Sequence, residues 1–127
     1  VLVYGWDYMI PSRIVESFPC FNIHPSLLPK YRGPDPVTVQ LLEKERLTGV
    51  TIHKMNDRLD AGPIWKQKEI KIDPTQPRLV YLKIAGTVMR LVDELLSTLE
   101  KAGFDASKLE LFPQNEEEAT YYSRKRN

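Results

Sequence analysis

Residues 20–36 read Cys20-Phe21-Asn22-Ile23-His24-Pro25-Ser26-Leu27-Leu28-Pro29-Lys30-Tyr31-Arg32-Gly33-Pro34-Asp35-Pro36. The first five residues predict a short strand that ends at Pro25. The stretch from Pro25 onward holds four prolines, which predict a rigid and irregular loop. Asp35 followed by Pro36 is typical of a helix N-cap and first turn, so we expect a helix from Pro36 to about Arg46.

The segments on both sides extend this alternation of strands and helices. We expect further strands at residues 1–4, 48–56 and 63–72 and helices at 12–18 and about 78–102. The last helix ends before Gly103 and has a stripe of apolar residues at three- and four-residue steps, which we expect to pack in the core: Tyr81, Ile84, Ala85, Val88, Val92, Leu95 and Leu99. Strands that alternate with helices imply right-handed crossovers. We therefore predict an α/β fold with a mostly parallel sheet.

The overall composition is that of an ordinary globular domain. The chain has 127 residues, of which 42% are hydrophobic and 28% are charged, and its net charge is +1. These values exclude a disordered chain and give no preference for nucleic acid. Cys20 is the single cysteine, which excludes an internal disulfide framework. Since no apolar run reaches about 18 residues and no signal peptide is recognisable, we expect a cytoplasmic protein with no membrane partner.

Three polar residues suggest a site at the end of the strand that contains His24. Asn22 lies two residues before His24, so both side chains point to one face. An amide beside an imidazole can polarise a carbonyl and transfer a proton, and Asp60 in the turn Asp57–Gly62 can orient the imidazole. The residues alone leave two alternatives open, which are His24 as the partner of a backbone carbonyl and Asp60 as a turn residue that bonds its own backbone. His53, in the middle of a strand, is assigned a structural role.

The segment Asn22–Gly33 resembles the core motif of the folate-dependent formyltransferases. The segments Thr48–His53 and Leu59–Ile64 are similar to the next strand of that family and to its aspartate loop. Asp60 follows His24 by 36 residues, which also fits the family.

The resemblance runs from about Val3 to Ile72 and more weakly to Arg126. It implies a Rossmann-like formyltransferase sheet without its N-terminal strands. Residues 1–112 would form the C-terminal half of the catalytic domain, and residues 113–127 would form a polar tail or linker.

The resemblance implies transfer of a formyl group from 10-formyltetrahydrofolate to a primary amine, without a metal. Asn22 would donate to the oxyanion, His24 would transfer a proton, and Asp60 would orient His24 or take the amine proton through a water. The branch that we favour is methionyl-tRNA formyltransferase-like, with initiator tRNA as the partner and a role in translation initiation. The alternatives are a glycinamide ribonucleotide or sugar-amine formyltransferase, a formyltetrahydrofolate hydrolase, and a non-catalytic fragment. The oligomeric state stays open.

The resemblance also implies two sets of binding residues. The folate donor would contact Trp6, Asp7, Tyr8, Met9, Ile10, Arg58 and Leu59. The acceptor would contact Ser26, Lys30, Arg32 and Gly33. Two alternatives stay open. Trp6 and Tyr8 can be interpreted as residues that anchor the loop to the core, and Lys30 and Arg32 as solvated loop charges.

Overall fold

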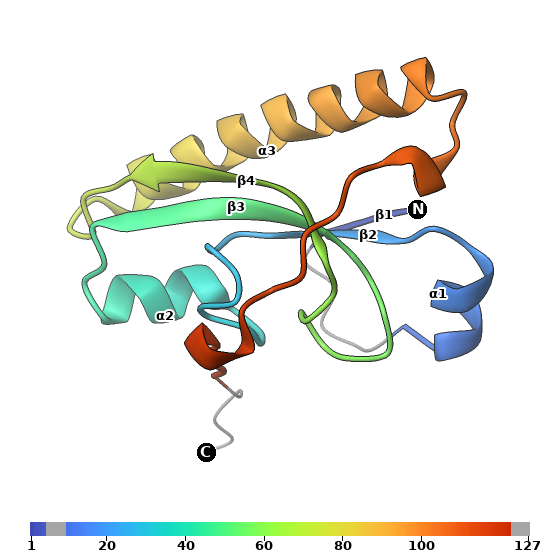
Figure 1. Cartoon of the computed structure of the whole chain (residues 1–127). Helices are drawn as coiled ribbons and strands as arrows, with labels where there is room; N and C mark the ends of the chain where they lie inside the picture. The colour runs from blue at the N-terminus through green and yellow to red at the C-terminus, as the bar shows by residue number, and fades with distance from the viewer. Residues whose placement is uncertain (5–9, 123–127) are drawn as a thin grey trace.

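The computed structural model describes residues 1–4 and 10–122, and within them a four-stranded sheet is flanked by helices (Figure 1). The elements are β1 (Leu2–Tyr4), α1 (Ser12–Ser17), β2 (Phe21–His24), α2 (Pro36–Leu42), β3 (Leu47–Lys54), β4 (Ile64–Lys71), α3 (Pro77–Lys101) and the 3₁₀ helices η1 (Ala106–Lys108) and η2 (Glu116–Glu118). All the predicted strands and helices are present, although α2 ends earlier than expected. No helix in the described residues is long and apolar enough to cross a membrane.

The sheet is mixed, and its strand order is β1-β2-β3-β4. β1 and β2 are parallel and are joined through α1, whereas β2 pairs with β3 and β3 pairs with β4 in the antiparallel sense. The predicted α/β class is confirmed, with the correction that the described sheet is mixed rather than mostly parallel.

The two antiparallel pairs have different connections, a long one through α2 and a short one without a helix. Gln40 of α2 donates to the Pro25 carbonyl oxygen at 2.9 Å, which holds the helix beside the end of β2. α2 has seven residues, and a helix of that length spans only about 10 Å. After this short helix the chain re-enters the sheet as β3, which runs antiparallel to β2. The segment 55–63 contains no helix, and parallel strands need a crossover of about a dozen residues or more.

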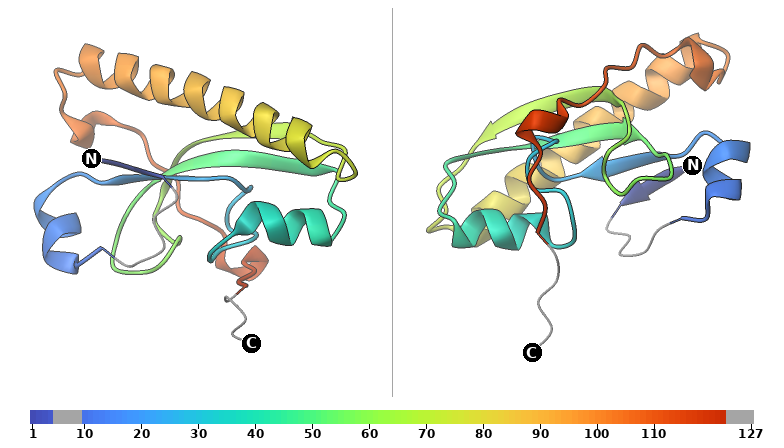
Figure 2. Two further views of the ribbon diagram at one scale, coloured as in Figure 1. Left: turned by 180° about the vertical axis from the view of Figure 1, so that it is seen from behind. Right: turned by 60° about the horizontal axis from the view of Figure 1, so that its bottom comes forward.

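α3 packs along one face of the sheet and supplies much of the core, while α2 lies on the other side (Figure 2). Ile84 and Leu95 belong to the stripe expected from the sequence, and both are buried with Val50 and Ile52 of β3. Tyr81, expected in the same stripe, is 50% exposed. The predicted helix is therefore correct, and its buried face is slightly rotated from the expected one.

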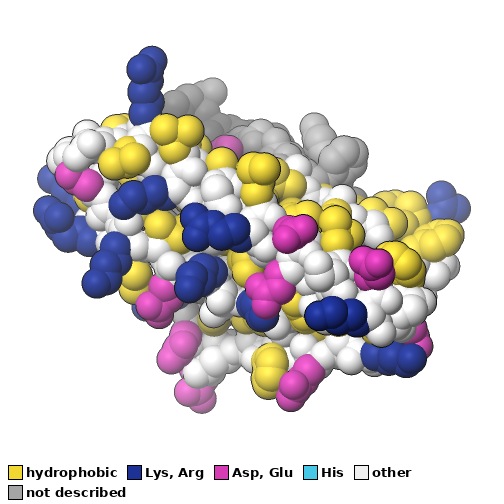
Figure 3. Space-filling model, turned by 90° about the horizontal axis from the view of Figure 1, so that it is seen from above, with side chains coloured by type: hydrophobic (Ala, Val, Ile, Leu, Met, Phe, Trp, Pro, Cys, Tyr) yellow, Lys and Arg dark blue, Asp and Glu magenta, His cyan; other side chains and the backbone are white. Residues whose placement is uncertain are grey.

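The outward face of α3 is mixed in character. Figure 3 shows hydrophobic side chains interspersed with Lys, Arg, Asp and Glu on this side of the molecule. Leu82, Met89 and Leu96 of α3 are among the exposed hydrophobic residues. Only the inner face of α3 is therefore committed to the described core.

Candidate active site

His24, the last residue of β2, is buried and anchored by the loop that follows it. Its Nε2 lies 2.8 Å from the carbonyl oxygen of Tyr31. A carbonyl oxygen only accepts hydrogen bonds, so Nε2 carries the proton of the neutral ring. The other ring nitrogen, Nδ1, lies 3.6 Å from Oδ1 of Asp60. One ring nitrogen thus anchors His24 to the backbone, and the other faces a carboxylate.

Asp60 connects the turn between β3 and β4 to the loop after β2. It is 9% exposed, and its backbone is left-handed with φ of 53°. Oδ2 accepts the backbone N–H of Gly33 at 2.8 Å, while Oδ1 faces His24 and accepts from Nδ2 of Asn22 at 3.4 Å. The carboxylate therefore bonds across the site, where it meets both of the other predicted catalytic residues.

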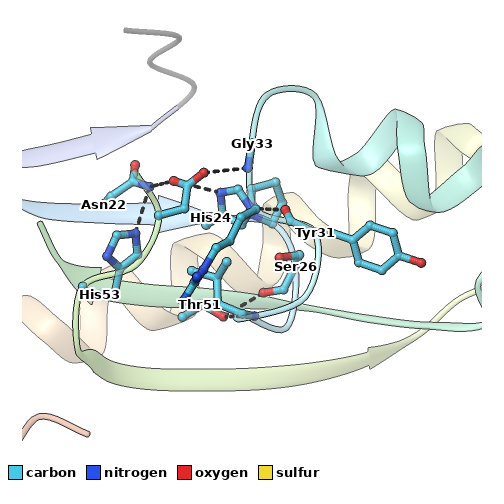
Figure 4. A network of polar contacts seen from close by, with 12 residues as sticks. Asn22, His24, Ser26, Tyr31, Gly33, Thr51 and His53 are labelled. Carbon is cyan, nitrogen blue, oxygen red and sulfur yellow. Dashed lines mark hydrogen bonds and ion pairs between the residues drawn. The ribbon is translucent and has the colours of Figure 1, made fainter. Parts of the chain in front are cut away.

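Asn22 also contacts His53, for which the sequence predicted a structural role. The two residues lie directly opposite each other in the antiparallel β2–β3 pair, and Nδ2 of Asn22 lies 3.2 Å from Nε2 of His53 (Figure 4). Nδ1 of His53 lies 3.2 Å from the Lys54 carbonyl oxygen, so Nδ1 carries the proton and Nε2 accepts from the amide. The two amide hydrogens of Asn22 thus point to His53 and Asp60, and this fixes which end of the amide faces them.

Burial controls the protonation of both histidines. It lowers the pKa of His24, although the Asp60 carboxylate and the Tyr31 carbonyl oppose that shift. Burial also lowers the pKa of His53 to about 4. Both rings are therefore neutral near pH 7, and the tautomers fixed by the two carbonyl groups are the relevant ones.

His53 could have been recognised only with the correct strand pairing. In a mostly parallel sheet, nothing places position 53 opposite position 22. In the antiparallel register, the two residues are direct neighbours on one face, with side chains in reach of each other. The contact between Asn22 and His53 could not be predicted, because the strands were expected to be parallel.

The four predicted acceptor-binding residues occupy different environments in the loop after β2. Ser26 is fully buried, and its Oγ donates to the Lys30 carbonyl oxygen at 2.7 Å. Arg32 is 7% exposed and bonds Glu116 and Gln114. Gly33 is buried and bonds Asp60 through its N–H. Of the four, only the Lys30 side chain is exposed, so the remaining three fix the loop within the chain.

A pocket of about 340 Å³ lies beside these groups, and Asn22, His24 and Asp60 all line it. This volume is within the range of small-molecule sites. Of the predicted donor-binding residues, Leu59 lines the pocket, while Arg58 is exposed and its guanidinium lies 3.7 Å from Glu116. Ile10 is half-buried. The others, Trp6, Asp7, Tyr8 and Met9, lie outside the described residues. Within the described residues, no His, Cys, Asp and Glu side chains form a group of three or more that could hold a metal ion.

Known proteins match both the sequence and the fold of this chain. The family model described as "Formyl transferase" matches residues 1–83. The methionyl-tRNA formyltransferase of Thermotoga maritima is 46% identical over 125 residues, which cover 95% of this chain and 38% of that protein.

Two solved structures extend the comparison. The formyltransferase PseJ from Anoxybacillus kamchatkensis, in complex with UDP-4,6-dideoxy-4-formamido-L-AltNAc and tetrahydrofolate, is 32% identical with a TM-score of 0.80. The match covers 96% of this chain and 62% of PseJ. HypX from Aquifex aeolicus, in complex with tetrahydrofolic acid, has a TM-score of 0.83 at 21% identity, and the match covers 98% of this chain and 21% of HypX. The second likeness concerns the fold, which is the Rossmann-like arrangement of these enzymes.

This chain spans 38% of the length of the Thermotoga maritima relative. Within that span, the family model covers well over half of the chain and includes the strand of Asn22 and His24 and the turn of Asp60. The two structural likenesses extend over nearly all of the chain. On these grounds, the chain belongs to the formyl transferase family.

Proposed function

We propose that this chain carries the site that transfers a formyl group from 10-formyltetrahydrofolate to a primary amine, with methionyl-tRNA as the acceptor. The observation that carries the proposal is the convergence of Asn22, His24 and Asp60 on one pocket. Membership of the family supports the reaction class. The 46% identity to a methionyl-tRNA formyltransferase supports the choice of acceptor.

The reaction forms a bond between the amine nitrogen and the formyl carbon and breaks the bond from that carbon to the folate nitrogen. One proton moves from the amine to the leaving nitrogen, and the carbonyl oxygen is negative in between. Asn22 would donate to that oxygen. Its hydrogen bond to Asp60 is long, at 3.4 Å, so this amide hydrogen can be redirected to the oxyanion while the other stays on His53. A donor of this kind contributes about 3–4 kcal/mol to the transition state.

His24 and Asp60 provide the path for the proton. Because Nε2 of His24 is fixed on the Tyr31 carbonyl oxygen, Nδ1 is the nitrogen that can take up a proton, and it faces Asp60. Burial lowers the pKa of His24, so the ring is neutral and able to accept when the attacking amine becomes positive. The Asp60 carboxylate then stabilises the imidazolium until the proton reaches the leaving nitrogen.

The binding roles expected from the sequence remain part of this proposal. The folate donor would lie against Leu59 and the segment 6–10. Tetrahydrofolate in the 32% identical PseJ complex supports a donor of this class. Lys30 is the exposed cation available for an acceptor phosphate. The proposal also includes a cytoplasmic location, and the chemistry requires no metal.

Two substitutions test the assignment in the full chain, with release of tetrahydrofolate from 10-formyltetrahydrofolate as the readout. We expect Asn22→Ala and Asp60→Asn each to lower kcat/KM by about 100-fold or more. Asp93→Asn, which removes an exposed carboxylate of α3, is the matched control and should stay within about twofold of wild type. If either site variant also stayed within about twofold, the assignment would be wrong.

A sugar-amine acceptor is the second candidate, because PseJ was solved with a formamido-sugar nucleotide and is 32% identical. Comparing kcat/KM for methionyl-tRNA, an amino-sugar nucleotide and glycinamide ribonucleotide separates the branches. Tetrahydrofolate release without any amine would instead identify a hydrolase.

A further inference from the structure

The segment after η1 folds back onto the loop that follows β2. Arg32 donates its backbone N–H to the Thr120 carbonyl oxygen at 2.9 Å, and its own carbonyl accepts from Tyr122 at 3.0 Å. Tyr31 donates its N–H to Oγ1 of Thr120 at 2.8 Å. The sequence predicted a polar tail or linker from residue 113; in the structure, residues 120–122 of this segment form a strand-like contact with the loop that anchors His24.

Gln114 is the most completely bonded residue of this segment. It is 9% exposed. Its Nε2 donates to the backbone oxygens of Asp60 at 2.9 Å and Gly62 at 2.8 Å. Its Oε1 accepts from Nε of Arg32 at 3.2 Å and from Nη2 at 2.8 Å. An amide group offers two donor hydrogens and two acceptor lone pairs, so all of its capacity is used.

Asp60 needs an external anchor of this kind. Its φ of 53° lies in the left-handed region that side-chain-bearing residues rarely adopt. The carboxylate has one short hydrogen bond, from Gly33, and its distances to Asn22 and His24 are 3.4 and 3.6 Å. The position of the carboxylate therefore depends on the backbone of the turn.

We propose that Gln114 is a positioning residue of the active site, which holds the Asp60 turn and Arg32 together so that the Asp60 carboxylate stays against His24. Gln114 is then part of the support of the site. The effect of Gln114 on catalysis rests on the proposed function, while its role in holding the Asp60 carboxylate against His24 does not.

The test compares Gln114→Met with Asn115→Leu in the full chain. Each variant replaces an amide with an apolar side chain of similar size. Asn115 is the exposed neighbour whose Oδ1 accepts from the Glu117 N–H, away from Asp60. Both variants are assayed at a temperature where they remain folded. We expect Gln114→Met to lower kcat about tenfold or more with KM within about threefold, and Asn115→Leu to leave both parameters within about twofold.

A second readout does not require activity. The groups that face His24 are the Tyr31 carbonyl of its own loop, Asp60 of the turn and His53 of β3. Because the Asp60 charge raises the pKa of His24 against burial, displacement of the carboxylate should lower that pKa further, as followed by NMR titration of the ring. Loss of stability alone would leave the native-state pKa unchanged.

The outcomes separate the two proposals. If Gln114→Met matches Asn115→Leu in kcat and in the pKa of His24, the positioning role is overturned even where formyl transfer is measured. If the wild-type chain transfers no formyl group, the proposed function fails, while the titration still decides the geometric role. Should Gln114→Met not fold, Gln114→Asn keeps the amide but is one methylene too short to span Arg32 and Asp60. It should lower the pKa of His24 in the same direction, and an unchanged value would refute the role.

Discussion

Replacing His53 by glutamine should remove a large part of the acid sensitivity of this chain. His53 is 1% exposed, and burial lowers its pKa from 6.5 to about 4. The unfolded chain therefore binds a proton at this ring more readily than the folded chain does. Stability is fully present above pH 6.5 and is lost as the pH falls toward 4. At pH 5.0 the folded ring is still mostly neutral, so the loss relative to pH 7.5 is about 2 kcal/mol.

The measurement is urea unfolding of wild type and His53→Gln at pH 7.5 and 5.0. The wild type should lose about 2 kcal/mol more between the two pH values than the variant, because glutamine does not titrate. The lowered pKa of His24 acts in the same direction in both proteins and cancels. Val50→Ala, at a fully buried position of the same strand, should lower stability equally at both pH values. If wild type and His53→Gln lost equal stability on acidification, the inference that folding buries His53 as a neutral ring would be refuted.

Two further predictions concern stability at pH 7.5 and are read from urea unfolding. Gly33→Ala should cost about 2–4 kcal/mol, because φ is 105° and a Cβ would lie 2.3 Å from the Tyr122 carbonyl oxygen. Gly103→Ala has φ of 66° with nothing within 4 Å, so it should cost only about 1–2 kcal/mol, and equal costs would contradict the steric argument. Leu95→Ala, at a fully buried position, should cost about 3–5 kcal/mol. Leu82→Ala, at a side chain that is 69% exposed, should stay within about 0.5 kcal/mol, and a similar loss for both would place the core elsewhere.

The sequence was sufficient for the elements whose signals are local. The apolar steps of α3, the prolines around the loop 25–36 and the strand that ends at His24 are set by neighbouring residues. The structure has each of them within a few positions of its predicted bounds. The capping signal before α2 was only partly right, since Asp35 occupies the N-cap position in a left-handed conformation and its side chain makes no capping hydrogen bond.

The features that the sequence did not predict depend on contacts between distant segments. Strand direction is one, because the antiparallel β2–β3 pairing joins residues that lie 27 to 33 positions apart in the sequence. His53 became part of the site only through that pairing. Gln114 has no local signal at all, since its partners lie 52 to 82 residues away. The periodicity of apolar residues and the spacing of motifs report on neighbours along the chain. They carry little information on contacts between distant segments.

The position of Gln114 also explains how an arginine can lie beside the site without neutralising its carboxylate. Arg32 precedes Gly33, whose N–H bonds Asp60, and a free guanidinium there would form a charge-assisted pair with the carboxylate. Instead, the guanidinium of Arg32 donates its hydrogen bonds to Gln114 and Glu116, and its Nη1 lies 2.8 Å from Oε2 of Glu116. A neutral amide thus separates the two charges, since its oxygen faces Arg32 and its nitrogen faces the backbone of Asp60. The Asp60 carboxylate therefore faces His24, as the proposed proton transfer from an amine requires.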